Sequence, residues 1–296
     1  MRLPTIKQLQ YFLALTETEH FGRAADRCFV SQSAFSNAIQ ELEATLSAQL
    51  VDRTNRNVTI TAKGQEVAVQ ARLVVNDIES LVETARGNDS PLASELRLGV
   101  IPTIAPFMLP GALPKLRKSY PDLRLLLAED QTDRIVRRLM DGELDVLLLA
   151  LPWQMQGVEE MPLFRDSFCL ACREGTKRVN PKNYRYNRLD SDSILLLEDG
   201  HCLREHALAA CKLRDTEKVR RFGASSLLTL IEMVDADLGI TFLPEMARGS
   251  ALLRNTRVRL SPLDEQSYRT IGLAWRKGSR QADEFRLLGE FLRDNA

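Results

Sequence analysis

The chain changes character once, at a short polar stretch over residues 87–94 (GNDSPLAS). Before it, apolar residues recur at helical spacing, whereas after it short apolar runs alternate with amphipathic segments. Gly, Asn, Ser and Pro close together favour a linker, because they stabilise turns rather than helices or strands. With 296 residues the chain has room for two or three domains. The sequence therefore predicts an α/β multidomain protein divided at this linker.

The N-terminal part, residues 1–61, has the pattern of a winged helix-turn-helix domain. An amphipathic stretch over residues 4–17 is followed by a short helical segment over 20–30 and a longer one over 31–46. Ser31 is the expected N-cap of the longer helix. The next segment, QLVDRTNRNVTITAKG, alternates apolar and polar residues around a polar turn, which predicts a hairpin.

A long helix is expected from Thr61 to about Arg86, with apolar residues along one side. We assign residues 62–94 to a linker helix and hinge. A striped helix between two domains is often a dimerisation element, although it can equally pack on its own domain.

Residues 95–296 read as an effector domain in which strands and helices alternate, and this favours a mostly parallel sheet. Two such sets, followed by a late strand over 270–279, suggest two lobes with a cleft between them. We assign lobe I to 95–165 plus 269–296 and lobe II to 166–268.

Bulk composition restricts the class of protein. Formal net charge is zero, so DNA binding needs a local motif to support it. No apolar run approaches the roughly 20 residues of a membrane helix, and the N-terminus does not read as a signal peptide. We expect a cytoplasmic protein, in which paired thiols more often indicate metal or redox chemistry than structural disulfides.

One stretch concentrates the reactive side chains. LLLEDGHCLREHALAAC, residues 195–211, holds two of the five cysteines and two of the three histidines. Cys202 and Cys211 lie nine residues apart beside His201, Arg204 and His206. The alternative is that both cysteines are small buried hydrophobes, which is how most free cysteines behave.

The order of elements resembles the LysR-type transcriptional regulators over nearly the full length, through FGRAADRCFVSQSAFSNAIQELEATLSAQLVDRT, a long helix and a two-lobed domain like the periplasmic binding proteins. Within that family, GVIPTIAPFMLP, LLLEDGHCLREHALAAC, GITFLPE and RTIGLAWRKGS are similar to the OxyR peroxide sensors. The resemblance implies that Cys202 reacts with peroxide and that Cys211 resolves it as a reversible disulfide.

The same resemblance implies a peroxide pocket made by Thr103, Thr132, His201 and Arg269. Arg269, or a protonated His201, would favour the thiolate of Cys202, as would the first turn of a helix. One departure affects the segment expected to resemble HFRATS, which here begins with Arg221 and has glycine at Gly223. That departure puts the details of subunit coupling in doubt.

Geometry would make such a pair a switch. If residues 202–211 form one helix, the two cysteines are separated by about 13 Å along its axis. A disulfide needs Cα atoms within roughly 7 Å, so oxidation must unwind the segment. We interpret Cys169 and Cys172, a CxxC in a strand-like run with no second ligand pair nearby, as structural, and Cys28 as core.

The expected recognition helix carries no Lys or Arg, so its polar side chains would read bases or phosphates and flanking arginines would supply charge. The expected DNA-binding residues are Arg23, Ser31, Gln32, Ser33, Ser36, Asn37, Gln40, Arg53 and Arg56, and Lys63 is a further flanking charge.

We therefore expect a homo-oligomer, a dimer of dimers, that binds promoter DNA, takes hydrogen peroxide as effector, works with RNA polymerase and has no cofactor and no metal. Two other hypotheses remain. One is a LysR-type regulator that senses a small organic ligand in the interlobe cleft. The other is a thiol peroxidase, which sustained peroxide turnover would reveal and which the helix-turn-helix argues against.

Overall fold

The computed structural model describes residues 3–53, 58–85, 91–210, 218–219, 223–263 and 267–295. The chain divides into two compact units, Met1–Asp89 with Met140–Glu143, and Ser90–Leu139 with Leu144–Ala296. Within the described ranges no helix combines the length and the low charge that a membrane span needs. The domain and lobe boundaries assigned from the sequence stay a prediction.

The first unit is a winged helix-turn-helix followed by a long helix, as the sequence predicts. Its elements are α1 (Ile6–Thr18), α2 (Phe21–Arg27), α3 (Gln32–Leu46), β1 (Val51–Arg53), β2 (Val58–Ile60) and α4 (Ala62–Ala85). The strands β1 and β2 pair antiparallel as the wing. Ser31 is the N-cap of α3 and accepts a hydrogen bond from the Ala34 N–H, as expected. Phe12, Leu15, Phe35, Ile39 and Leu42 are completely buried between the helices.

The second unit is built on one mixed sheet that joins two lobes. Its strands are β3 (Glu95–Val100), β4 (Arg124–Glu129), β5 (Val146–Leu151), β6 (Val158–Arg173), β7 (Thr241–Pro244), β8 (Val258–Pro262) and β9 (Tyr268–Arg276). Its helices are α5 (Ala105–Ser119), α6 (Thr132–Met140), α7 (Cys202–Ala210), α8 (Leu227–Asp235), α9 (Ala251–Arg254) and α10 (Ala282–Asp294). Short 3-10 helices are η1 (Pro181–Asn183), η2 (Tyr186–Arg188) and η4 (Glu245–Ala247).

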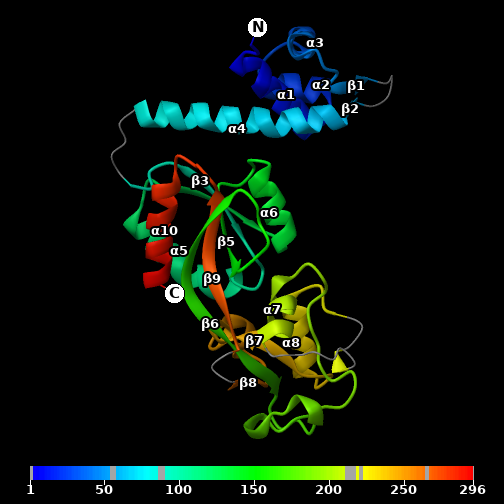
Figure 1. Ribbon diagram of the computed structural model, residues 1–296, viewed down its shortest axis with the longest axis vertical. Helices are drawn as coiled ribbons and strands as arrows, with labels where there is room; N and C mark the ends of the chain where they lie inside the picture. The colour runs from blue at the N-terminus through cyan, green and yellow to red at the C-terminus, as the bar shows by residue number, and fades with distance from the viewer. Residues whose placement is uncertain are drawn as a thin grey trace. The chain divides into compact units, whose positions relative to one another are not determined.

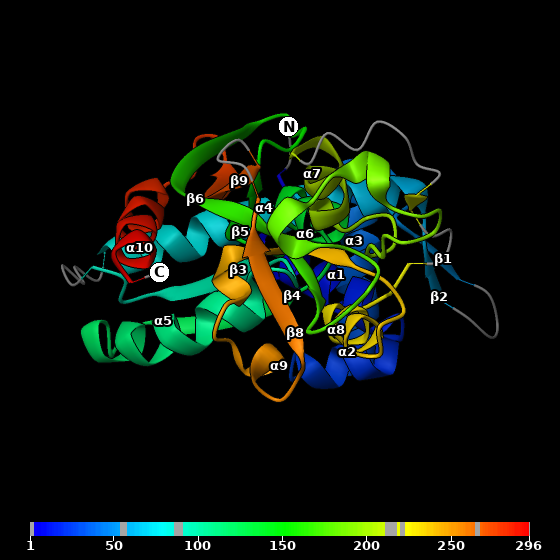
Figure 2. The same cartoon turned by 90° about the horizontal axis from the view of Figure 1, so that it is seen from below.

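The expectation of a mostly parallel sheet is wrong. Among the described strands only β3–β4 and β3–β5 pair in parallel, whereas β9 pairs antiparallel with β5 and β6. The far half of β6 pairs antiparallel with β7 and β8. The reason is that β6 and β9 run in opposite directions between the lobes, so each lobe is completed by a strand that comes from the other (Figures 1 and 2).

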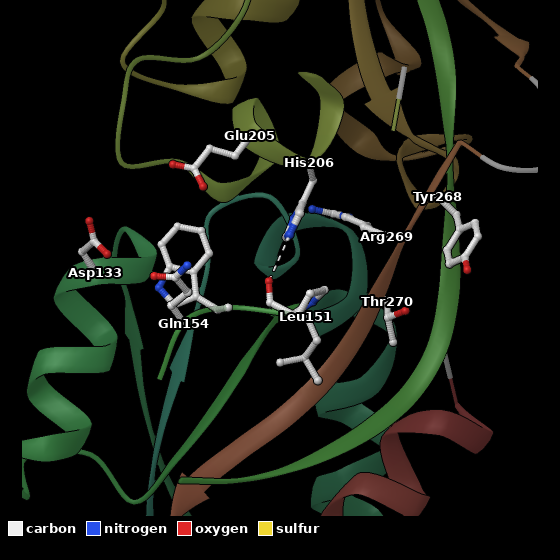
Figure 3. A pocket seen from close by; sticks show the side chains of 10 residues that line it. Asp133, Leu151, Gln154, Glu205, His206, Tyr268, Arg269 and Thr270 are labelled. Carbon is white, nitrogen blue, oxygen red and sulfur yellow. Dashed lines mark hydrogen bonds between the residues drawn. The ribbon is translucent and has the colours of Figure 1, made fainter. Parts of the chain in front are cut away.

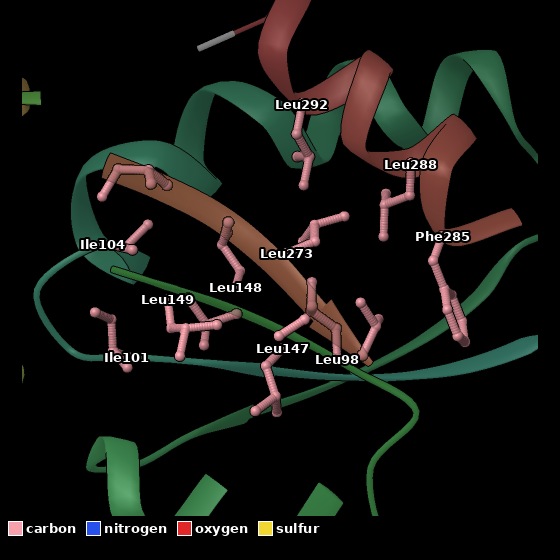
Figure 4. Close-up of a cluster of buried hydrophobic side chains, with 14 of the residues drawn as sticks. Leu98, Ile101, Ile104, Leu147, Leu148, Leu149, Leu273, Phe285, Leu288 and Leu292 are labelled. Carbon is pink, nitrogen blue, oxygen red and sulfur yellow. The ribbon is translucent and has the colours of Figure 1, made fainter. Parts of the chain in front are cut away.

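Each lobe has its own apolar core. In the lobe of β3 and β5, α5 and α10 lie on one side of the sheet and α6 on the other (Figures 1 and 2). Leu147, Leu148 and Leu149 of β5 are fully buried there, packed with Phe285 and Leu288 of α10 (Figure 4). The other lobe buries the far half of β6 with α7 and α8. The antiparallel pair of β6 and β9 connects these two cores.

The apolar run over residues 193–197 does not form the strand that the sequence suggests. Ile194 makes isolated bridges to Val219 and Ile240, and Leu197 bridges Ala224. All four residues from Ile194 to Leu197 are nonetheless buried. The hydrophobic pattern therefore reports burial at this place rather than a continuous strand.

Candidate functional site

The turn into α7 places Cys202 at the start of a helix. Gly200 has φ of +92°, and a Cβ at this position would lie 2.9 Å from the side-chain oxygen of Gln131. The left-handed backbone favours glycine here, and a larger residue would also displace the Gln131 side chain. Cys202 is the first residue of α7, as expected, and the structure describes its backbone alone. Cys211 lies outside the described residues.

Two of the predicted pocket residues have buried polar atoms without a partner. Thr132, the first residue of α6, is 1% exposed, and His201, which directly precedes α7, is 6% exposed. Among the described groups neither the Thr132 hydroxyl nor the His201 Nε2 has a hydrogen-bond partner. Such atoms are rare inside proteins, so each suits a small polar guest that can both donate and accept.

The buried position of His201 disfavours the protonated imidazole that the sequence offered as one source of positive charge. Burial lowers the pKa of its imidazole, while a hydrogen bond from the ring to the Ser225 backbone and the nearby Glu198 and Asp130 carboxylates oppose that change. A neutral ring is therefore favoured at neutral pH, since desolvation penalises the charged form.

Arg269 is held by a buried network that joins four parts of the second unit. Its Nε donates to the Asp166 carboxylate at 3.0 Å, and its two terminal nitrogens donate to the Thr103 hydroxyl at 3.0 Å and the Thr103 carbonyl at 2.9 Å. The other Asp166 oxygen accepts from the Met246 N–H at 3.2 Å. The predicted pair of Thr103 and Arg269 is thus in direct contact.

The positive charge expected from Arg269 is balanced by a partner that sequence reasoning missed. The side chains of Arg269 and Asp166 are 0% and 3% exposed. Burial raises the pKa of Asp166, and the Arg269 guanidinium opposes that rise. The ion pair fixes the orientation of the guanidinium and compensates its charge.

A cavity of about 1070 Å³ lies between α6, α7 and the beginning of β9 (Figure 3). It is lined by Asp133, Leu151, Pro152, Trp153, Gln154, Glu205, His206, Tyr268, Arg269 and Thr270. Of the four predicted pocket residues, Arg269 alone lines it. The other three, Thr103, Thr132 and His201, are buried and do not line it.

His206 is the second residue that sequence reasoning left without a role. Its Nε2 lies 3.4 Å from the Pro152 carbonyl, and its Nδ1 has no partner among the described groups (Figure 3). Burial lowers the pKa of His206, the Pro152 hydrogen bond opposes this, and the nearby Arg269 adds to it. Its position four residues after Cys202 places it on the same face of α7, which was the available signal.

The CxxC is buried within β6, which supports the structural interpretation. Cys169 and Cys172 are 1% and 2% exposed. The Cys169 thiol donates to Oε2 of the Glu245 carboxylate at 2.7 Å, and Arg248 donates to the same oxygen at 3.0 Å. Among the described residues no group of His, Cys, Asp and Glu could hold a metal ion.

Cys169 is expected to resist modification in the folded protein. Burial and the hydrogen bond to Glu245 raise the pKa of Cys169 to about 12, so almost no thiolate is present at pH 8. With iodoacetamide at pH 8, the peptide containing Cys169 and Cys172 should remain unlabelled until the protein is unfolded in guanidinium. Labelling of Cys169 in the native state at the rate of a free thiol would contradict its burial.

Cys28 does not lie inside a helix. It is the C-cap of α2, half-buried, and packs against the core of the first unit. Burial raises its pKa, and Arg27 partly opposes the change.

The polar face of α3 is exposed to solvent, as a recognition helix requires. Ser31, Gln32, Ser33, Asn37 and Gln40 are exposed and Ser36 is half-buried. Arg23 is exposed as well, and one of its terminal nitrogens donates to the Thr18 carbonyl at 2.8 Å. These side chains are therefore accessible to a binding partner.

The structure describes only some of the residues predicted for the wing and for subunit coupling. Arg53 is the last residue of β1, with its backbone alone described, and Arg56 and Arg221 lie outside the described residues. Gly223 is described, and a Cβ there would lie 2.9 Å from the Glu198 backbone nitrogen. A larger residue at this position would require the neighbouring backbone to move.

Family comparisons agree with this two-part organisation. Residues 6–65 match the bacterial regulatory helix-turn-helix protein, lysR family, and residues 89–296 match the LysR substrate binding domain.

Individual relatives extend over nearly the whole chain. The regulator EstR of Acinetobacter baylyi is 39% identical over 98% of this chain and 97% of its own. The dual regulator OxyR of Escherichia coli is 37% identical over 97% and 94%. A solved full-length OxyR from Pseudomonas aeruginosa, 29% identical, superposes with a TM-score of 0.80 over 99% of this chain and 96% of its own.

Proposed function

The chain belongs to the LysR family of transcriptional regulators, and we propose that it binds promoter DNA and senses hydrogen peroxide through a reversible Cys202–Cys211 disulfide. The observation that carries the peroxide part is the pair of unpartnered buried atoms, on Thr132 and His201, beside the opening of α7. Peroxide is small, donates two hydrogen bonds and accepts more. It would give both atoms a partner next to the reacting thiol.

The helix opening favours the reactive form of Cys202. In the first turn of α7 the helix dipole stabilises an anion, which lowers a thiol pKa. Arg204 contributes a cation to the same turn, although its Nε is paired with Asp199 at 2.9 Å. A neutral His201 would hydrogen-bond peroxide rather than supply charge.

The chemistry balances without a cofactor. The Cys202 thiolate attacks one peroxide oxygen, the S–O bond forms, the O–O bond breaks, and the leaving hydroxide takes a proton to become water. Attack by the Cys211 thiol on the sulfenic acid forms the S–S bond and releases a second water. A dithiol reductant from the cell would return the protein to its starting form.

The length of α7 makes the disulfide a conformational event. The helix extends from Cys202 to Ala210, so the Cα atoms of those residues are about 12 Å apart. A trans peptide moves the next Cα by about 3.8 Å, which leaves at least about 8 Å to Cys202 in any arrangement. Since a disulfide needs Cα atoms within about 7 Å, its formation must unwind part of α7.

Unwinding α7 would release contacts between the lobes. His206 leaves the Pro152 carbonyl, and Glu205 leaves the cavity wall. We propose that this change reaches the subunit contacts of a homotetramer and alters how it meets its operator and RNA polymerase. The site of action is the cytoplasm.

On the DNA side, the open polar face of α3 supports base reading by Gln32, Ser33, Ser36, Asn37 and Gln40. Because α3 lacks Lys and Arg, we assign phosphate contacts to Arg23 and to Arg53 and Arg56 on the wing, while Ser31 caps the helix at its DNA-facing end.

Substitutions on the wing and on α3 should distinguish phosphate contacts from base contacts. Arg53→Ala or Arg56→Ala should weaken binding to all duplexes and flatten the salt dependence by roughly one unit per lost phosphate contact. Gln32→Ala should instead change sequence preference at an unchanged slope. Fluorescence anisotropy across a salt series measures both, and an unaltered slope in both arginine variants would remove the wing from the contact set.

A second candidate function uses the cavity. Its volume of about 1070 Å³ exceeds what peroxide needs, and it is lined by Trp153, His206 and Tyr268, a set that suits a small organic molecule. Under this alternative Cys202→Ser would leave regulation intact.

The experiment that tests the proposal is a footprint of one promoter by the full-length protein, before and after stoichiometric peroxide. Peroxide should move the footprint edge and a dithiol reductant should restore it. A footprint that responds to small carboxylates, and not to peroxide, would replace the peroxide proposal with the ligand alternative.

A further inference from the structure

Phe29 combines two features that are unfavourable in isolation. Its side chain is 95% exposed, the largest exposure of any large apolar residue in the described part of the chain. Its backbone has φ of +56°, in the left-handed region that bulky residues rarely occupy. The residue lies in the turn between α2 and α3, directly before the N-cap region of the recognition helix.

The turn is well formed, so the strain is built into the fold. The Phe29 N–H donates to the Asp26 carbonyl, and the Val30 N–H donates to the Ala25 carbonyl, both at 3.1 Å. These two bonds make the Schellman ending of α2, in which this position is usually glycine and sometimes asparagine. Phenylalanine gains nothing from the turn, since glycine or asparagine would relieve the backbone and expose less apolar surface.

The surroundings of Phe29 indicate the chemistry of a partner. Beyond it along the chain come the exposed polar residues Gln32 and Ser33 of α3. Phe29 itself lines a hollow of about 550 Å³, together with the polar residues Lys7 and Gln10 and with Ile6, Tyr11, Cys28 and Val30. A partner that fits here carries negative charge, hydrogen-bonding groups and accessible apolar atoms together, and duplex DNA has all three.

We propose that Phe29 is a DNA contact, whose ring packs on apolar atoms of the duplex beside α3, either thymine methyl groups or deoxyribose carbons. The contact would add affinity without charge, which suits a chain of zero net charge whose recognition helix lacks Lys and Arg. The proposal rests on the DNA-binding part of the proposed function and is independent of the peroxide chemistry.

Phe29→Asn tests the contact without endangering the fold, because asparagine accepts the left-handed backbone. The probe is a set of duplexes selected from a random library by the wild-type protein. The variant should bind them about tenfold more weakly, the value expected for losing one partly buried aromatic contact. Its salt slope should equal that of the wild type, because no phosphate contact is removed.

Ser47→Asn is the matched control. Ser47 is also exposed, also has a positive φ, of 50°, and ends α3. The substitution relieves the same kind of backbone strain and keeps the net charge, but removes no aromatic ring. It should bind the selected duplexes as the wild type does, and thermal unfolding followed by circular dichroism should show both variants at or above the wild-type midpoint.

Replacing each thymine by uracil then identifies the atoms contacted. If wild type loses affinity at one position and Phe29→Asn does not, the ring packs on that methyl group; if no position matters, it packs on deoxyribose. Phe29→Asn binding within twofold of wild type would overturn the proposal and leave Phe29 as a protein-binding residue. A wild type that selects no duplex at all would remove the DNA-binding premise and this proposal with it.

Discussion

Replacing Asp166 with alanine is expected to destabilise the second unit by about 3–5 kcal/mol, because it leaves a buried arginine without its counter-charge. The Arg269 side chain is 0% exposed, so water compensates its charge poorly once the carboxylate is removed. The Met246 N–H loses its acceptor in the same variant. We expect the Thr103 contacts of Arg269 to loosen as well, so peroxide reactivity should fall together with stability.

The measurement is urea unfolding followed by tryptophan fluorescence. Both tryptophans of the chain, Trp153 and Trp275, belong to the second unit, so the signal reports that unit alone. Asp283→Ala is the control, since it removes an exposed carboxylate that pairs with Arg286 at 2.7 Å and should cost less than about 1 kcal/mol.

A double variant separates lost charge from lost shape. Adding Arg269→Met to Asp166→Ala removes the uncompensated charge, so the pair should be less destabilised than the sum of the single variants. An Asp166→Ala protein as stable as the Asp283→Ala control would mean that the buried pair contributes nothing to the frame.

The Cys211→Ser protein is expected to react with peroxide but not to proceed, beyond oxidation of Cys202, to a disulfide. Cys202 keeps its helix opening, so the sulfenic acid should form at close to the wild-type rate, but it then lacks its resolving thiol. Dimedone labelling of Cys202 should rise at least tenfold over the wild type, with slow conversion to sulfinic acid. The operator footprint should stay close to the reduced one, because nothing holds α7 unwound.

Two further variants serve as controls for the Cys211→Ser experiment. Cys202→Ser should show neither dimedone labelling nor a footprint change. Cys28→Ser removes a thiol from the other unit and should behave as the wild type in both assays. If Cys211→Ser shifts its footprint as fully as the wild type does, oxidation of Cys202 alone is the signal and the unwinding of α7 is not needed.

The helical first unit was predictable because local rules decide it. Ser31 precedes an apolar stripe and caps α3 as its position suggests, and the alternating residues up to Arg53 and from Val58 form the two paired strands of the wing. Cap and period are properties of adjacent residues, so a single sequence contains them.

The sheet was only partly predictable, because β6 does not keep a strand pattern along its length. Pro162 interrupts the run, and the register with β9 shifts between Pro162 and Phe164. The strand therefore reads as several short pieces, and its role in joining the lobes stays hidden. Its direction against β9, which makes the sheet mixed, depends on contacts between distant residues.

The sequence motif led to the candidate site, but it did not reveal the residue that holds Arg269 in place. Thr103 and Arg269 came from the resemblance, yet Asp166, which holds Arg269, is 103 residues away and is one of several charged residues of β6, beside Arg165. Nothing in the local sequence distinguishes the buried Asp166 from its charged neighbours or indicates that its partner is Arg269. The left-handed turn at Phe29 was missed for a similar reason, since glycine, its usual marker, is absent.

The most direct measurement of the thiol switch is peptide mapping of alkylated protein before and after one equivalent of hydrogen peroxide. The reduced chain should show five free thiols on unfolding, one for each cysteine. After peroxide three should remain, at Cys28, Cys169 and Cys172, with a single bridged peptide joining Cys202 to Cys211. Five free thiols after peroxide, or a bridge between Cys169 and Cys172, would contradict the account.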